Sequence, residues 1–124
     1  MGDGATRQSG FNLAKELIAS GIDNVGILAY NDIVASGILA ALRDSKHEVG
    51  RDISLISIDD IESSKFETPA LSTVDVNAPE LGRKAAESLL GIIAGKEKVK
   101  KTVFLNNKLI IRESCGCSED KKVS

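Results

Sequence analysis

The sequence has no tryptophan, one tyrosine and three phenylalanines, so aromatic residues make up only 3% of its 124 residues. A hydrophobic core must therefore be built from isoleucine, leucine, valine and alanine, which suit buried parallel strands and the helices that cover them. No apolar run approaches the roughly 20 residues of a membrane-spanning helix, and the N-terminus lacks the basic-then-apolar order of a signal peptide. We therefore expect a cytoplasmic protein that has no membrane partner.

The sequence also lacks a large excess of charge of either sign. Its 16 basic and 18 acidic residues give a net charge of -2, so there is no general basic field that would attract a phosphate backbone. The chain carries no helix-turn-helix pattern either. We therefore expect this chain to make no direct contact with nucleic acid.

Cysteine is scarce as well, and the two cysteines, Cys115 and Cys117, are separated by a single residue. This spacing matches neither a disulfide framework nor a four-ligand zinc site. We expect a reduced, exposed pair, and a soft-metal site or a strained disulfide stays open as an alternative. No metal ion and no cofactor are predicted.

The apolar pattern predicts helices that alternate with strands. A first helix has Thr6 as its N-cap and stops at Gly21, and a second is capped by Asp32 and extends to Leu42. Between them, residues 25–30 form an unbroken apolar run, which is typical of a strand covered on both faces. A second strand is predicted over residues 53–58, after a polar loop in which His47 is expected to be solvated.

The second half of the chain continues this alternation. A third strand is predicted within residues 68–74, followed by a helix that Asn77 and Glu80 open as a capping box and that Gly95 closes. Two short strands, 102–105 and 109–111, are expected around a turn at 106–107. The fold class is thus α/β, with a mostly parallel sheet flanked by helices. Residues 1–117 are expected to form one domain, and residues 118–124 a disordered polar tail.

Polar pairs end the first two predicted strands, Asn31-Asp32 and Asp59-Asp60. In parallel sheets ligands bind beyond the carboxyl ends of the strands, so Asn31 and Asp59 are candidate ligand-binding residues. The alternative is that these pairs only form turns and helix caps. We interpret Asp32 and Asp60 as structural in that sense.

Five sequence motifs in a fixed order resemble the LacI/GalR family of transcriptional regulators. They are ILAYND at residues 27–32, GRDISLISIDDI at 50–61, TPALSTV at 68–74, LGRKAA at 81–86 and LIIRES at 109–114. The resemblance implies the C-terminal part of an effector-binding domain of the periplasmic-binding-protein-like type I fold. In that fold two α/β lobes close on a small molecule, commonly a sugar or a nucleobase.

The resemblance also implies roles for single residues. Asn31 matches a family position that hydrogen-bonds the effector, and Asp59 matches an acidic position that binds a hydroxyl or a ring nitrogen. The helix over residues 80–94 would pack on the first lobe, whose motifs this sequence does not contain, and residues 61–66 match family dimer contacts. We therefore expect a homo-oligomer whose interface includes Ile61, Phe66, Leu89, Ile92 and Ile93.

Three functions compete at this point. The first is the non-catalytic sensing lobe of a LacI-type regulator, which in this fragment would bind a sugar- or nucleoside-like effector only weakly. The second is a phosphoacceptor that uses the acids at the strand ends, but the sequence has no glycine-rich phosphate loop and no lysine at the end of another core strand. The third is an oligomerising interaction fragment that binds no ligand. We expect no enzyme activity.

Overall fold

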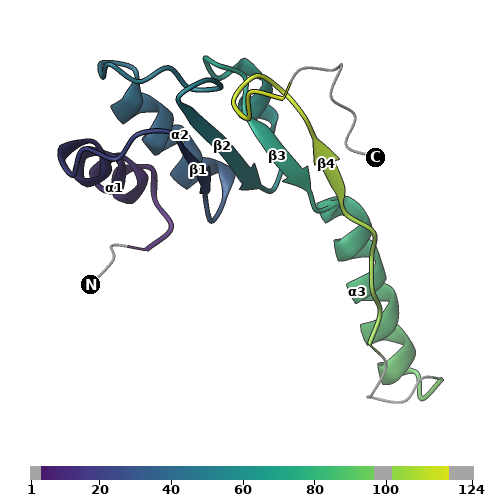
Figure 1. Ribbon diagram of the computed structural model, residues 1–124. Helices are drawn as coiled ribbons and strands as arrows, with labels where there is room; N and C mark the ends of the chain where they lie inside the picture. Colours follow the sequence, from purple (N-terminus) through teal and green to yellow (C-terminus); the bar gives the residue numbers. More distant parts are fainter. Residues whose placement is uncertain (1–3, 97–101, 118–124) are drawn as a thin grey trace.

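The computed structural model describes residues 4–96 and 102–117 (Figure 1). Its elements, in chain order, are α1 (Arg7–Ala19), β1 (Val25–Leu28), α2 (Asp32–Leu42), β2 (Ile53–Ile58), the 3-10 helix η1 (Glu62–Phe66), β3 (Ser72–Asp75), α3 (Ala78–Ile93) and β4 (Lys108–Ile110). The predicted alternation of helices and strands is confirmed.

The strands of the described residues form one sheet in the order β1-β2-β3-β4. β1, β2 and β3 are parallel, with Ile27 paired to Leu55 and Ser57 paired to Thr73. β4 is antiparallel to β3. The mostly parallel sheet predicted from the sequence is therefore confirmed, and the carboxyl ends of its first three strands lie at one edge.

The hydrophobic core lies where α2 packs against the sheet, and α1 packs in turn against α2. Leu39 and Leu42 of α2, Leu55 of β2 and Leu71 are at most 2% exposed. The buried members are aliphatic, as the shortage of aromatic residues predicted, and Phe11 packs against them only partly buried.

Two glycines bring the backbones of α1 and α2 into direct contact. A Cβ atom on Gly10 would lie 2.1 Å from the Val34 carbonyl oxygen, and one on Gly37 would lie 1.9 Å from the Arg7 carbonyl oxygen. No side chain fits at such distances, so glycine at these two positions sets how closely the helices approach.

One face of β1 is open, which corrects the expectation of a strand covered on both faces. Gly26 is exposed, and the Leu28 side chain is 72% exposed, while Val25 and Ile27 are half-buried. Val25 and Ile27 pack against the core that α1 and α2 share with the sheet, whereas Gly26 and Leu28 on the other face are exposed.

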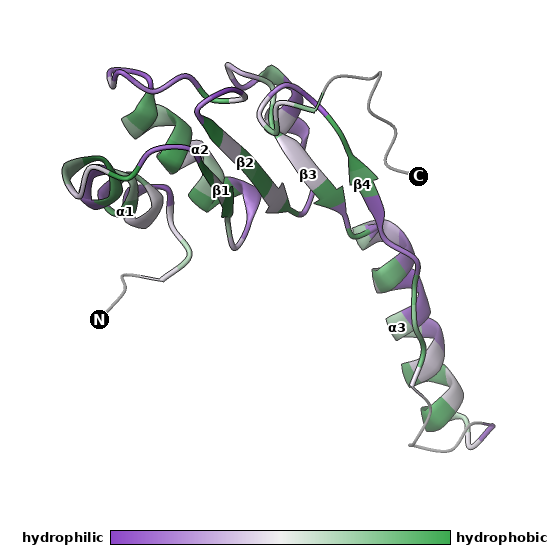
Figure 2. Cartoon of the chain, in the orientation of Figure 1, coloured by the Kyte–Doolittle hydropathy of each residue, from purple (hydrophilic) through white to green (hydrophobic). Residues whose placement is uncertain are grey.

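Helix α3 extends away from the sheet and has no buried residue (Figures 1 and 2). Val103 and Leu105 line a shallow groove together with Leu81 and Ala85 of α3, so this segment runs beside the helix. The strand expected over residues 102–105 is therefore wrong, because the segment lies along α3 and away from the sheet edge. Of the two expected terminal strands, only β4 is present in the described residues.

The helix caps confirm part of the sequence interpretation. Thr6 caps α1, and its Oγ1 accepts a hydrogen bond from the Ser9 amide at 3.1 Å. The expected Asp32 cap is wrong, because Asn31 caps α2 and Asp32 is its first helical residue. The expected capping box of α3 is also wrong. Asn77 adopts a left-handed conformation without a side-chain cap bond, and Glu80 pairs with Arg83.

His47 is buried, which corrects the expectation of a solvated side chain. It is 8% exposed, and its Nδ1 lies 3.4 Å from Asp23 Oδ1, because the loop after α2 turns the ring toward the loop before β1. Within the described ranges, no helix has the length and apolarity that crossing a membrane requires. The tail predicted over residues 118–124 lies outside the described residues.

The contact at Gly37 leads to a stability prediction. Gly37→Ala should lower the free energy of unfolding by about 1–3 kcal/mol, because the new methyl group must displace the Arg7 carbonyl. Gly82→Ala in α3 is the control, since a Cβ there meets nothing within 4 Å. It should be neutral or stabilise the chain by up to about 1 kcal/mol. Urea denaturation followed by circular dichroism measures both, and equal effects would contradict the role of Gly37 in helix packing.

Candidate functional site

Asn31 and Asp59 lie at the same edge of the sheet. Leu28 of β1 is paired with Ile56 of β2, and each candidate residue lies three positions beyond its member of this pair. The parallel register therefore brings the two candidate residues to neighbouring strand ends, as the rule for ligand sites in such sheets predicts.

The Asn31 side chain is oriented by its role as the N-cap of α2. Its Oδ1 accepts a hydrogen bond from the Val34 amide at 2.9 Å, which satisfies one of the helix's unpaired N–H groups. The side chain is half-buried. Because the cap bond uses only the oxygen, the amide nitrogen Nδ2 remains as a fixed donor at the edge of the sheet.

Asp59 is exposed and has an uncommon backbone conformation. Its φ is 117°, and that of Asp60 is 50°. Residues other than glycine rarely adopt positive φ values. The Asp59 amide still donates to the Val74 carbonyl at 2.9 Å, so the turn is tied to β3. Desolvation and the nearby Asp32 carboxylate raise the pKa of Asp59 above its usual value.

Behind this edge, the buried Asp32 carboxylate joins four elements. Its Oδ1 accepts hydrogen bonds from Ser57 of β2 and, at 2.6 Å, from Thr73 of β3. Its Oδ2 accepts from Ser64 of η1 at 2.5 Å and from the Ile61 amide at 2.9 Å. A buried carboxylate needs such donors to offset its lost hydration. The structural role predicted for Asp32 is thus confirmed, with a different set of contacts from the helix cap that was expected.

Asp60 is structural too, through an ion pair with the segment that follows β4. Arg112 Nη2 lies 2.7 Å from Asp60 Oδ1, and its Nη1 donates to the Leu71 carbonyl at 2.7 Å. Both side chains of the pair are mostly buried. This pair holds the C-terminal segment of the described chain against the loop that carries Asp59.

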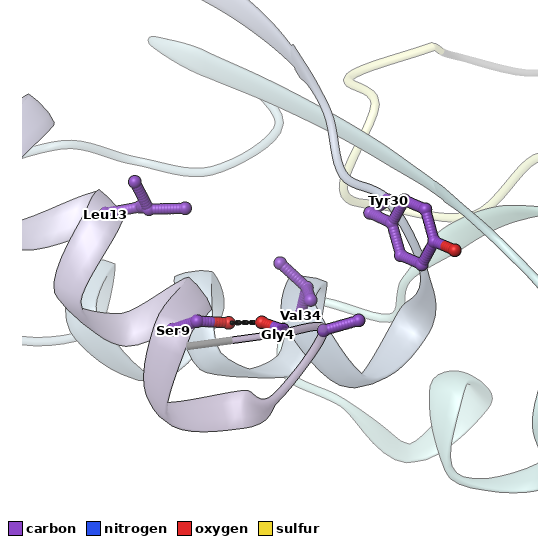
Figure 3. Close-up of a pocket in the computed structure, with 6 residues that line it drawn as sticks. Gly4, Ser9, Leu13, Tyr30 and Val34 are labelled. Carbon is purple, nitrogen blue, oxygen red and sulfur yellow. Dashed lines mark hydrogen bonds between the residues drawn. The ribbon is translucent and has the colours of Figure 1, made fainter. Parts of the chain in front are cut away.

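A hollow of about 390 Å³ lies beside the start of α1 (Figure 3). It is lined by Gly4, Ala5, Ser9, Leu13, Tyr30 and Val34. Neither Asn31 nor Asp59 lines it, although two of its lining residues, Tyr30 and Val34, flank the Asn31 cap. Tyr30, which is 75% exposed, was not among the site residues predicted from the sequence. Its position directly before Asn31 is the signal that could have identified it.

The residues predicted at a dimer interface fall into two groups. Ile61 is half-buried and Phe66 is 73% exposed, and both lie at η1. Leu89 and Ile93 are exposed on α3, where Ile92 is half-buried. The structure holds a single chain, so this interface stays a prediction.

The cysteines differ from the expected exposed pair. Cys115 is buried and Cys117 is exposed, and both are thiols. Within residues 4–96 and 102–117, no three histidine, cysteine or acidic side chains come together in a way that could hold a metal ion. Two thiolates alone do not complete a tetrahedral zinc site.

Comparison with known proteins extends this description. A family model, the periplasmic binding protein-like domain, matches residues 1–115. The HTH-type transcriptional regulator GalR of Lacticaseibacillus casei is 36% identical over 111 residues, which are 88% of this chain and 34% of that protein. The match to the family model includes all five sequence motifs, which lie within residues 27–114.

Two solved structures share the fold. The lac repressor dimer bound to operator and the anti-inducer ONPF has a TM-score of 0.82 and 31% identity, covering 89% of this chain and 33% of that chain. A LacI family transcriptional regulator from Arthrobacter sp. FB24, in complex with lactose, has a TM-score of 0.80 and 32% identity, covering 89% and 41%. This chain therefore spans between a third and two fifths of the length of these proteins.

The hydrogen bonds to Asp32 predict that the stability of the fold depends on this carboxylate. Asp32→Ala should lower the free energy of unfolding by about 3 kcal/mol or more, because it leaves several buried donors without an acceptor. The exposed Asp44 offers a matched control, and Asp44→Ala should change the free energy by less than about 0.5 kcal/mol. Urea denaturation of both variants checks this, and equal midpoints would refute it.

Proposed function

This chain belongs to the periplasmic binding protein-like domain family, in its LacI/GalR branch, and from that membership we propose that it senses a small molecule as part of a transcriptional regulator. Its fold is a partial lobe of that domain. The effector would be sugar- or nucleoside-like, and the regulator would act in the cytoplasm without catalysing a reaction.

The observation that carries this proposal is the pairing of a fixed donor with an acceptor at one edge of the sheet. Asn31 offers Nδ2 while its oxygen caps α2, and Asp59 offers an exposed carboxylate. The Asp59 carboxylate would accept a charge-assisted hydrogen bond from a ligand hydroxyl, and Asn31 Nδ2 would donate to an acceptor on the ligand. The complex with lactose in a similar structure supports an effector of this class.

This lobe supplies only one wall of such a cleft. A ligand on one wall recovers part of the contacts, yet it still loses most of its translational and rotational freedom on binding. We therefore propose that the chain alone binds its effector weakly. The net charge of -2 supports the further proposal that this chain does not itself contact operator DNA.

Nuclear magnetic resonance titration of the isotope-labelled chain with ribose, lactose and adenosine tests the site. We expect one of these probes to shift the amide signals of residues 31 and 59 with a dissociation constant of about 1 mM or weaker. Asn31→Asp tests the donor separately from the helix cap, because aspartate keeps the cap and lacks the Nδ2 donor. It and Asp59→Ala should each abolish the shifts, whereas Asp44→Ala should leave them unchanged.

The pH dependence gives a second readout of the same titration. Because the pKa of Asp59 is raised, its carboxylate takes up a proton at a pH where an ordinary aspartate is still ionised. Binding through this acceptor should weaken as the pH falls through that raised pKa, and Asp59→Ala should remove this dependence. Micromolar binding that survived both site variants would show that the ligand binds elsewhere.

A second candidate function, an oligomerising fragment, is favoured by the exposed helix α3. Leu81, Leu89, Leu90 and Ile93 on this helix are each more than half exposed, and a helix with so wide an apolar surface calls for a partner. A second copy of the chain could cover it, since two-fold dimers are the commonest closed assemblies. The lac repressor structure, itself a dimer, supports self-association.

Sedimentation velocity at tens of micromolar tests this candidate. We expect a dimer or a larger assembly, and Ile93→Glu should shift it to monomer because a charge would be buried in the interface. Leu13→Glu is the matched control, since Leu13 is also exposed but lies on α1. Phe66→Glu tests the η1 surface in the same way. A stable monomer for the unchanged chain would rule the candidate out.

A further inference from the structure

Cys115 and Cys117 lie in a turn at the amino ends of the strands, whereas Asn31 and Asp59 lie at the carboxyl ends. The chain reaches this turn after β4, whose antiparallel course leads back to the amino end of β3. Ser114, just before the turn, is fully buried and fastens it to the sheet. Its carbonyl accepts from the Leu55 amide at 2.8 Å, and its Oγ donates to the Leu55 carbonyl at 2.7 Å and accepts from the Ser72 amide at 2.8 Å.

Backbone contacts hold the turn from its other side. Gly116 has a φ of 66°, and a Cβ atom there would lie 2.1 Å from the Gly50 carbonyl oxygen. Gly50 has a φ of 91°, and a Cβ there would lie 2.6 Å from the Glu113 carbonyl oxygen. The residue between the two cysteines is therefore fixed against the loop before β2, and only glycine fits on both sides of the contact.

The two cysteines are joined by hydrogen bonds but differ in solvent access. The Cys117 amide donates to Cys115 Sγ at 3.2 Å, and Cys117 Sγ donates to the Cys115 carbonyl at 3.8 Å. Cys115 is 6% exposed, whereas Cys117 faces solvent. A reagent in solution thus reaches Cys117 first, with Cys115 directly behind it.

The surroundings of Cys115 favour its thiolate. Burial raises the pKa of this thiol, but hydrogen bonds from Cys117, from Ser72 and from the backbone outweigh burial and leave the pKa below its usual value. The thiolate is the form of cysteine that attacks a disulfide. A buried thiolate next to an exposed thiol is the arrangement that resolves a mixed disulfide.

We propose that Cys115 and Cys117 form a reversible dithiol–disulfide site whose substrate is a small-molecule disulfide. The Cys117 thiolate attacks one sulfur of that disulfide, the S–S bond breaks, and one small thiol leaves with a proton. The Cys115 thiolate then attacks Cys117 Sγ and releases the second small thiol. The two cysteines lose two electrons and two protons in total, and the small disulfide gains them.

A disulfide across one intervening residue closes a short ring, and this favours reversibility. Closing so short a loop removes little entropy from the unfolded chain, and strained, exposed disulfides are readily reduced. A metal site fits the same residues less well, because the described chain offers no third ligand beside the two thiols. Oxidation of the pair is therefore the chemistry that the turn supports.

Mass spectrometry of the full chain treated with oxidised glutathione tests the proposal. We expect a loss of two hydrogen atoms from the peptide that holds both cysteines, without lasting glutathione adduct, and full recovery after reduced glutathione is added. Cys115→Ser should instead accumulate the mixed disulfide at Cys117. Cys117→Ser should react at least about tenfold more slowly than the unchanged chain, because the remaining thiol is buried.

Gly116→Ala tests the turn itself. The added methyl group must displace the Gly50 carbonyl, so the second step should slow and the mixed disulfide should accumulate at Cys117. Circular dichroism shows whether each variant stays folded, and alkylation of the unchanged chain gives the order of thiol access without any substitution. Equal alkylation of both cysteines, a stable mixed disulfide on the unchanged chain, or disulfide-linked dimers in place of the internal bond would each overturn the proposal.

Discussion

The buried Asp32 carboxylate is the interaction on which the arrangement of the described chain depends. It accepts hydrogen bonds from β2, η1, β3 and the Ile61 amide. An isolated carboxylate could not be buried at a tolerable free energy, and the hydroxyls around it would be equally costly to bury without an acceptor. Each partner therefore requires the others, and together they fix the start of α2 against the ends of two strands.

This arrangement gives the two edges of the sheet different chemistry. At the carboxyl edge, Asp32 sets the position of the Asn31 cap and the turn that carries Asp59, so a polar donor and acceptor face outward beside a buried anion. At the opposite edge, Ser114 and the Gly50–Gly116 contact hold the cysteine turn. The proposed effector site and the proposed thiol site thus lie at opposite ends of the same strands, with the core between them.

Helix α3 and the open face of β1 leave apolar side chains exposed, so the described residues bury apolar surface mainly in the core around α2. The core between α2 and the sheet is densely buried, whereas α3 has no buried residue and Leu28 projects from an uncovered face. Apolar surface of this extent is stabilising only when it is removed from water. The proteins that match this chain are more than twice as long, and helix α3 is where self-association is proposed.

The sequence by itself determined the alternation of helices and strands over residues 7–93, the aliphatic core and the edge at which Asn31 and Asp59 lie, because periodicity and strand ends are read from neighbouring residues. Only the tertiary structure decided that Asn31 and not Asp32 caps α2, that His47 is buried, and that residues 102–105 follow α3. The physical reason is distance along the chain. Asp32 bonds Thr73, 41 residues away, and Ser114 bonds Leu55 across 59 residues, so these partners come together only when the sheet has formed.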